Sequence, residues 1–180
     1  MKAITILQPW ASLIAIGAKQ YETRSWQTKY RGPIAIHAAK KNPCKMSTAG
    51  TEQFVNTANK YLCLGWKMGW HWSMLPLGYV IATAELVNCW SIVWHPGSNV
   101  DESKYVTIGA ELDVSKKHKD FGRFIMPTVT EMIFGDWTPG RYAWELSNIR
   151  LLQEPIPAKG AQGLWNWTGE TGVIEQPLFI

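Results

Sequence analysis

The sequence predicts an α+β fold in which short strands form a compact barrel and helices pack on its outside. The length of 180 residues fits one domain, since a single core usually serves roughly 100–200 residues. Apolar residues make up 46% of the chain and charged residues 18%, so the composition is typical of a folded chain with one core. Short β-type runs also outnumber helical repeats, which favours the barrel arrangement.

Four elements are expected before residue 41. In chain order they are a strand at 1–7, a helix at 9–16, a strand at 19–26 and a strand at 34–39. Pro9 is tolerated in the first turn of the helix, and Gly17 suits the left-handed residue that commonly follows a helix. Alternation along the strand at 19–26 puts Glu22 and Arg24 on the same face.

The remaining chain has fewer clear patterns. The expected elements are a helix at 51–63, an irregular segment at 64–76 with Trp66, Trp70 and Trp72, a strand at 77–90, a turn at 134–141, a strand at 142–146, and extended chain at 155–157 and 160–167. The run at 77–90 is largely apolar, so this strand is expected to be central and buried on both faces. Residues 91–120 are weakly patterned, and no element is expected there.

The cysteines and the lengths of the apolar runs argue against several classes of protein. The three cysteines are an odd number without a Cys-x-x-Cys pair, which argues for a reducing compartment and against a disulfide framework or structural zinc. Cys89 is expected to be a small core residue. No apolar run approaches the ~20 residues of a membrane span. We therefore expect a cytoplasmic protein with no metal, cofactor or membrane segment.

Positive charge is concentrated at the start of the chain. Residues 1–41 hold seven basic residues and one acidic residue, a net charge of +6, whereas the whole chain carries +4. Such a local excess is what binding to a polyanion requires, because neutralisation of phosphates dominates affinity for nucleic acids. A solvated basic face without a ligand would have the same composition, so charge alone does not distinguish it from a polyanion-binding surface.

Lys19, Glu22 and Arg24 bring charges of both signs into six residues. The planar guanidinium of Arg24 can bind a phosphate or the edge of a base. The Glu22 carboxylate can accept a hydrogen bond from an exocyclic amine or act as a general base. Trp10 or Trp26 can stack on a base. The alternative is that Glu22 and Arg24 form a structural ion pair on their strand.

Two stretches form a pattern of fixed positions: Gln8-Pro-Trp-Ala-Ser-Leu13 and Gly17-x-Lys19-x-x-Glu22-x-Arg24-Ser-Trp26-x-Thr28-x-x-Arg31-Gly32. The pattern resembles the signature of ASCH domains in the PUA-like superfamily. The later segments at 78–89, 134–146 and 162–165 resemble the phage and bacterial branch of that family. The resemblance implies a PUA-like small β-barrel with flanking helices. It also implies a single domain over residues 1–180, with insertions at about 42–76 and 91–127.

The resemblance further implies a nucleic-acid or nucleotide ligand in a cleft lined by the Gly-x-Lys-x-x-Glu-x-Arg segment. The expected partner is RNA, another single-stranded nucleic acid or a modified nucleoside. The candidate binding residues are Gln8, Trp10, Ser12, Lys19, Glu22, Arg24, Ser25, Trp26, Thr28, Arg31, His37 and Lys40. For His37 an ordinary, partly buried histidine is the alternative.

One bacterial branch of the family hydrolyses N4-acetylcytidine, so a small amidohydrolase acting on an acylated pyrimidine nucleoside is the second interpretation. The threonine of that branch is Glu22 here. Glu22 would then activate a water, with Lys19 as acid or oxyanion partner, and these two residues would be catalytic. A nuclease and a protein–protein adaptor with exposed tryptophans are further alternatives; binding is the favoured interpretation.

Overall fold

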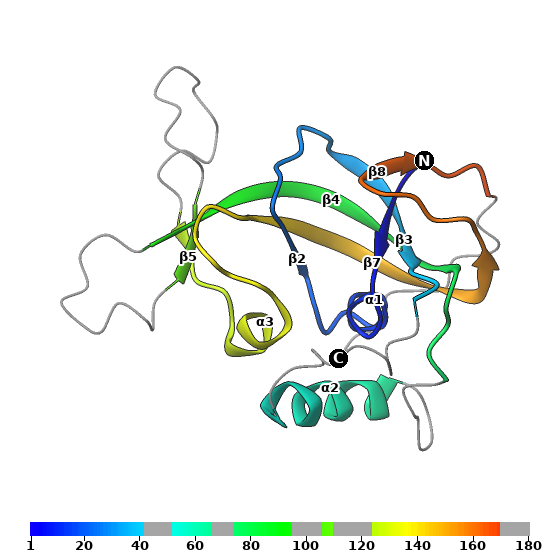
Figure 1. Ribbon diagram of the computed structural model, residues 1–180, viewed down its shortest axis with the longest axis horizontal. Coiled ribbons are helices and arrows are strands. Elements are labelled where there is room, and N and C mark those ends of the chain that lie inside the picture. The colour runs from blue at the N-terminus through cyan, green and yellow to red at the C-terminus, as the bar shows by residue number, and fades with distance from the viewer. Residues whose placement is uncertain (42–51, 66–73, 95–105, 110–123, 170–180) are drawn as a thin grey trace. The chain divides into compact units, whose positions relative to one another are not determined.

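The computed structural model describes residues 1–41, 52–65, 74–94, 106–109 and 124–169 (Figure 1). The chain divides into two compact units. The first comprises Met1–Gln20, Gly32–Glu85 and Ser147–Ile180, and the second comprises Tyr21–Arg31 and Leu86–Leu146. Two long strands, β4 (Tyr79–Trp94) and β7 (Tyr142–Pro157), contribute to both units.

Three strands of the first unit lie side by side (Figure 1). Strand β1 (Lys2–Ile6) pairs in parallel with β3 (Gly32–Ala38) and antiparallel with β8 (Leu164–Asn166). Ile4 lies opposite Ile36, and both side chains are buried. The strands predicted at 1–7 and 34–39 are confirmed, and β8 falls within the predicted extended chain at 160–167.

The predicted helix at 9–16 is confirmed as α1 (Trp10–Ala15). Gly17 follows it with φ +78°, the left-handed conformation expected there. Residues 11–15 are all buried, so α1 is enclosed on all sides and is less amphipathic than its sequence pattern suggests. Helix α2 (Glu52–Gly65) confirms the helix predicted at 51–63 and lies against α1, with the ring centroids of Trp10 and Phe54 5.4 Å apart. Trp66, Trp70 and Trp72 lie outside the described residues.

The strand predicted at 77–90 is confirmed as the longer β4, which has β7 and β3 as its neighbours. Residues 80–84 are buried in succession, as expected for a central strand with both faces covered. Beyond Glu85 the burial alternates, and Val87 is exposed. The strand predicted at 142–146 is the first part of β7, which continues to Pro157 and includes the extended chain expected at 155–157.

The second unit contains the strand predicted at 19–26, which is confirmed as β2 (Tyr21–Arg24), and three elements that the sequence pattern did not indicate. Strand β2 pairs antiparallel with β7. Strand β5 (Val106–Gly109) pairs with β4 and with β6 (Phe124–Ile125), and helix α3 (Val129–Phe134) follows. The buried cluster here consists of Trp90, Ile92, Trp137 and Ala143. The turn predicted at 134–141 lies between α3 and β7, and Gly140 has φ +88°.

The molecule is a mixed α+β protein, as predicted, and its described strands belong to one sheet. Among the described strands the order is β2-β7-β4-β3-β1-β8, with β5 joined to β4 and β6 joined to β5. The order has two ends, so closure into a barrel is not confirmed. None of the described helices is long and apolar enough to cross a membrane. The described residues contain no group of three His, Cys, Asp or Glu side chains arranged to hold a metal ion.

Candidate nucleic-acid interface

Glu22 and Arg24 form an ion pair on β2 of the second unit. They are two residues apart on a strand and therefore share a face, as predicted. The Nη2 atom of Arg24 lies 3.1 Å from Oε1 of Glu22, and the two side chains are 27% and 11% exposed. The ion pair weighed as a structural alternative is thus present. It offsets the charge of Arg24, whose partly exposed guanidinium still carries hydrogen-bond donors.

The face of β2 that carries this pair also carries aromatic side chains. Antiparallel pairing puts Arg24 opposite Tyr142 and Glu22 opposite Trp144, and opposed residues point to the same side of a sheet. The next residue of the same alternation is Trp26, whose ring meets the buried Trp144 edge-on, with centroids 4.6 Å apart and planes at 88°. The Trp144 indole N–H also donates to the Trp26 carbonyl over 3.3 Å. Trp26 is therefore held in place while remaining 36% exposed.

Arg31 is exposed and is held by three hydrogen bonds. Its Nη1 donates to the carbonyls of Thr28 over 2.9 Å and Tyr30 over 2.7 Å, and its Nη2 donates to Oδ1 of Asn88 over 3.3 Å. The Thr28 hydroxyl accepts from the Tyr30 N–H over 3.1 Å, which fixes the turn itself. Thr28 therefore supports the position of Arg31 through its carbonyl and its hydroxyl.

Asn88 is a member of this cluster that the sequence analysis did not single out. Its Oδ1 accepts from Arg31 and, over 2.9 Å, from the N–H of Cys89. Both partners are donors, so the oxygen of the amide must face them. The available signal was a polar residue within a largely apolar run, because a buried polar side chain is almost always hydrogen-bonded.

Cys89 is half-buried, so it is not the fully enclosed core residue that was expected. Burial raises the pKa of its thiol, while a hydrogen bond with the Thr28 backbone and the charge of Arg31 act in the opposite direction. The thiol therefore remains protonated at neutral pH and is a poor nucleophile. Ser25, which follows β2, is exposed, as is Lys29 in the turn.

The predicted site residues of the first unit are mostly internal. Gln8 is fully buried; its Nε2 donates to the Pro76 carbonyl over 3.0 Å, and its Oε1 accepts from the Ser12 N–H over 3.1 Å. Ser12 is buried too, and its hydroxyl has no hydrogen-bond partner within the described part of the chain. Trp10 is half-buried against Phe54. These positions favour packing roles.

Lys19 is only 1% exposed, although it was predicted to begin a strand beside a ligand. It precedes β2, and its backbone N–H donates to the Leu13 carbonyl over 3.1 Å, which closes the chain onto the end of α1. Lysine is almost never fully buried unless it is paired. Lys19 is therefore not one of the solvated surface charges that the composition of residues 1–41 suggests. Lys40 is exposed.

His37 is buried, and both of its ring nitrogens have partners. Nδ1 lies 3.2 Å from the Thr5 hydroxyl oxygen, and Nε2 lies 3.1 Å from the Ala158 carbonyl. Burial lowers the pKa of His37, and the Ala158 carbonyl partly opposes this. The ring also meets Trp165 edge-on, with centroids 5.7 Å apart. This geometry favours the ordinary buried histidine over a ligand-binding one.

Comparison with known proteins identifies the family. The sequence matches the profile of the ASCH domain over residues 4–152. It is also similar to activating signal cointegrator 1 from Homo sapiens and from Mus musculus, at 48% identity over 40 residues in each case. Those 40 residues are 22% of this chain and 7% of each cointegrator, so the similarity spans only a small part of these relatives. Because the profile covers most of the chain, the protein belongs to the ASCH-domain family.

Proposed function

We propose that the protein binds single-stranded RNA, and that the second unit supplies a binding surface made of Arg24, Ser25, Trp26, Thr28 and Arg31. The observation that carries the proposal is the exposed Trp26 ring, which packs edge-to-face against the buried Trp144. An aromatic ring fixed by its neighbours and open to solvent suits stacking on a base, and such stacking accepts any base because every base has a π face. The association of ASCH domains with RNA binding supports the same ligand.

The charged side chains around Trp26 support contacts with the rest of a nucleotide. Arg24 forms an ion pair with Glu22, and this contact orients its guanidinium. An oriented arginine fork binds base edges and phosphates at a lower cost in conformational freedom than a mobile one. The Glu22 carboxylate is suited to accept from the exocyclic amine of a base.

Further parts of the proposal rest on the family resemblance. A cleft lined by the Gly17 to Arg24 segment would also involve Lys19, which precedes Glu22 by three residues in the chain. A PUA-like barrel is the fold implied by the same resemblance. The amidohydrolase alternative would assign Lys19 and Glu22 to catalysis.

Fluorescence anisotropy with a short labelled single-stranded RNA tests the proposal. Replacing Trp26 with Ala should weaken binding by roughly tenfold or more, since stacking on one aromatic side chain contributes about 1–3 kcal/mol. Trp26→Phe keeps an aromatic face and should retain most of the affinity. Arg24→Ala should also weaken binding by about tenfold.

Lys29→Ala is the matched control for Arg24→Ala. Lys29 is an exposed cation in the same segment but lies outside the proposed surface, so its loss should change the affinity several-fold less. Equal losses for Arg24→Ala and Lys29→Ala would show that binding depends on charge alone and not on this surface. Release of acetate from N4-acetylcytidine by the wild-type protein would replace RNA binding with the amidohydrolase alternative.

A further inference from the structure

Arg31 differs from Arg24 and Arg141, two described arginines of the second unit that form ion pairs. Arg24 is paired with Glu22, and Arg141 is paired with Asp136, with 3.2 Å between Nε of Arg141 and Oδ2 of Asp136. The three acceptors around Arg31 are uncharged oxygens, and among the described residues it has no carboxylate partner. Arg31 therefore keeps its full positive charge at an exposed position.

The guanidinium of Arg31 is also oriented, and some of its N–H donors remain available for a ligand. A guanidinium has five N–H donors, and three hydrogen bonds leave at least two without an acceptor in the described part of the chain. The bonds to Thr28 and Tyr30 fix the guanidinium to its own turn, and the bond to Asn88 fixes it to β4. Ordering a long side chain before binding removes a cost that a free arginine would incur on binding.

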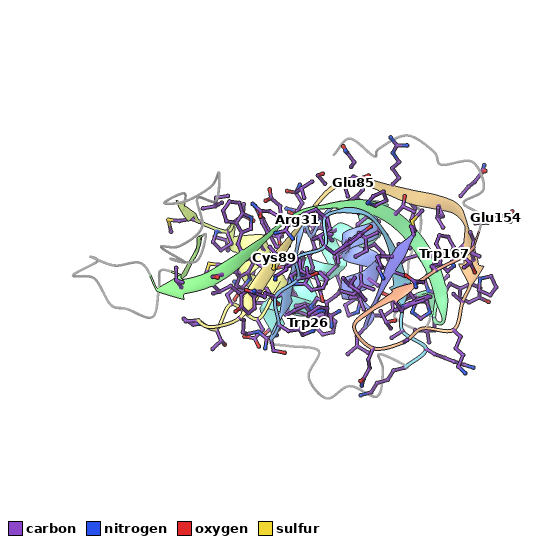
Figure 2. The ribbon with its side chains drawn as sticks, turned by 90° about the horizontal axis from the view of Figure 1, so that it is seen from above. Trp26, Arg31, Glu85, Cys89, Glu154 and Trp167 are labelled. Carbon is purple, nitrogen blue, oxygen red and sulfur yellow. The ribbon has the colours of Figure 1, made fainter. Side chains whose placement is uncertain are left out.

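The described neighbours Cys89 and Asn88 do not give Arg31 a negatively charged partner. Cys89, on β4, and Arg31, just before β3, lie in the same region of the second unit (Figure 2), and burial raises the pKa of the Cys89 thiol, so the thiol stays neutral. Asn88 is buried and uncharged, and its amide orientation is fixed by the Cys89 N–H as well as by Arg31. A fixed cation surrounded by neutral acceptors is suited to an oxyanion, and planar N–H pairs match phosphate oxygens.

We infer that Arg31 binds a phosphodiester group of the RNA strand and that Asn88 is the positioning residue that orients it. The inference rests on the proposed function and deepens it. With this contact the ligand includes the RNA backbone and is more than a single nucleoside. Asn88 acts only through Arg31 and does not touch the RNA.

The salt dependence of affinity separates these two roles. Each phosphate contact on a single strand contributes about 0.7 to the slope of log Kd against log salt concentration. Arg31→Ala should therefore lower the slope by about 0.7 and weaken binding by about tenfold. Arg31→Lys should keep the slope but bind several-fold more weakly than wild type, because an ammonium has no fork. Asn88→Ala should weaken binding several-fold without changing the slope.

A double-mutant cycle tests whether Asn88 acts through Arg31. In an Arg31→Ala background, Asn88→Ala should cause no further loss of affinity, whereas independent effects would multiply and would overturn the positioning role. Asn88→Asp keeps both acceptor contacts and gives Arg31 a carboxylate partner. It should keep the Tm of the wild type and weaken RNA binding as much as Arg31→Ala; full affinity in this variant would also overturn the inference.

Two controls make failure of the inference distinguishable from failure of the proposed function. Arg141→Ala removes an arginine that already has a carboxylate partner, so the slope should not change. A matched RNA with neutral methylphosphonate linkages should bind wild type and Arg31→Ala equally. Absence of RNA binding by the wild type would refute the proposed function. RNA binding with a slope that Arg31→Ala leaves unchanged would refute the phosphate contact only.

Discussion

His37 illustrates how a polar residue can look like a ligand group in sequence and be part of the interior. The Ala158 carbonyl can only accept, so the Nε2 atom of His37 carries the proton and Nδ1 accepts from the Thr5 hydroxyl. The Thr5 oxygen in turn accepts from the indole N–H of Trp165 over 3.1 Å. Gly160 lies so close that a Cβ there would be 2.4 Å from Cε1 of His37, so only glycine fits.

This arrangement predicts that acid weakens the fold through His37. Burial lowers the pKa of His37 from its ordinary value of 6.5, so as the pH falls through that value the unfolded chain binds a proton more readily than the folded chain. The unfolding free energy should therefore fall as the pH drops from about 6.5 towards 5.5, a range in which few carboxylates titrate. Thermal unfolding followed by circular dichroism should show a steeper fall of Tm for wild type than for His37→Gln. Parallel curves would mean that His37 does not couple protonation to folding.

At the scale of elements, the sequence predicts best what local pattern determines. The apolar run of β4 and the Pro9–Gly17 boundaries of α1 are such cases. Strands β5 and β6 were missed because short strands are defined by their partners and not by their own composition. Helix α3 was also missed, although Thr128 and Glu131 have the spacing of a helix-capping pair.

The start of α3 gives a prediction about stability. Thr128 is the N-cap, and its hydroxyl accepts from the Glu131 N–H over 3.2 Å. The helix ends with the buried Phe134, and the Glu131 carbonyl accepts from the indole N–H of Trp137 over 2.7 Å. Thr128→Ala should therefore lower the unfolding free energy by about 1 kcal/mol, measured by urea denaturation. Thr128→Ser keeps the acceptor oxygen and should change it by much less; equal losses would show that the hydroxyl does not cap the helix.

At the scale of the whole molecule, the sequence shows where the basic residues are concentrated but does not show which side chains of that segment are exposed. Arg31 and Trp26 are exposed, whereas Lys19, Gln8 and Ser12 are buried. The difference comes from tertiary packing, which a pattern of residue types does not contain. The charge excess of residues 1–41 therefore overstates the charge that faces solvent.

This reduced charge sets the salt dependence that we expect for RNA binding. On the proposed surface Arg31 is exposed, and Arg24 is partly exposed but paired with Glu22. One to two phosphate contacts would give a slope of about 0.7–1.4 for log Kd against log salt concentration on a single strand. Anisotropy titrations of the wild-type protein over a series of salt concentrations measure this slope. A flat dependence would contradict the polyanion interpretation and favour a single uncharged nucleoside as the ligand, because only phosphate contacts release counterions.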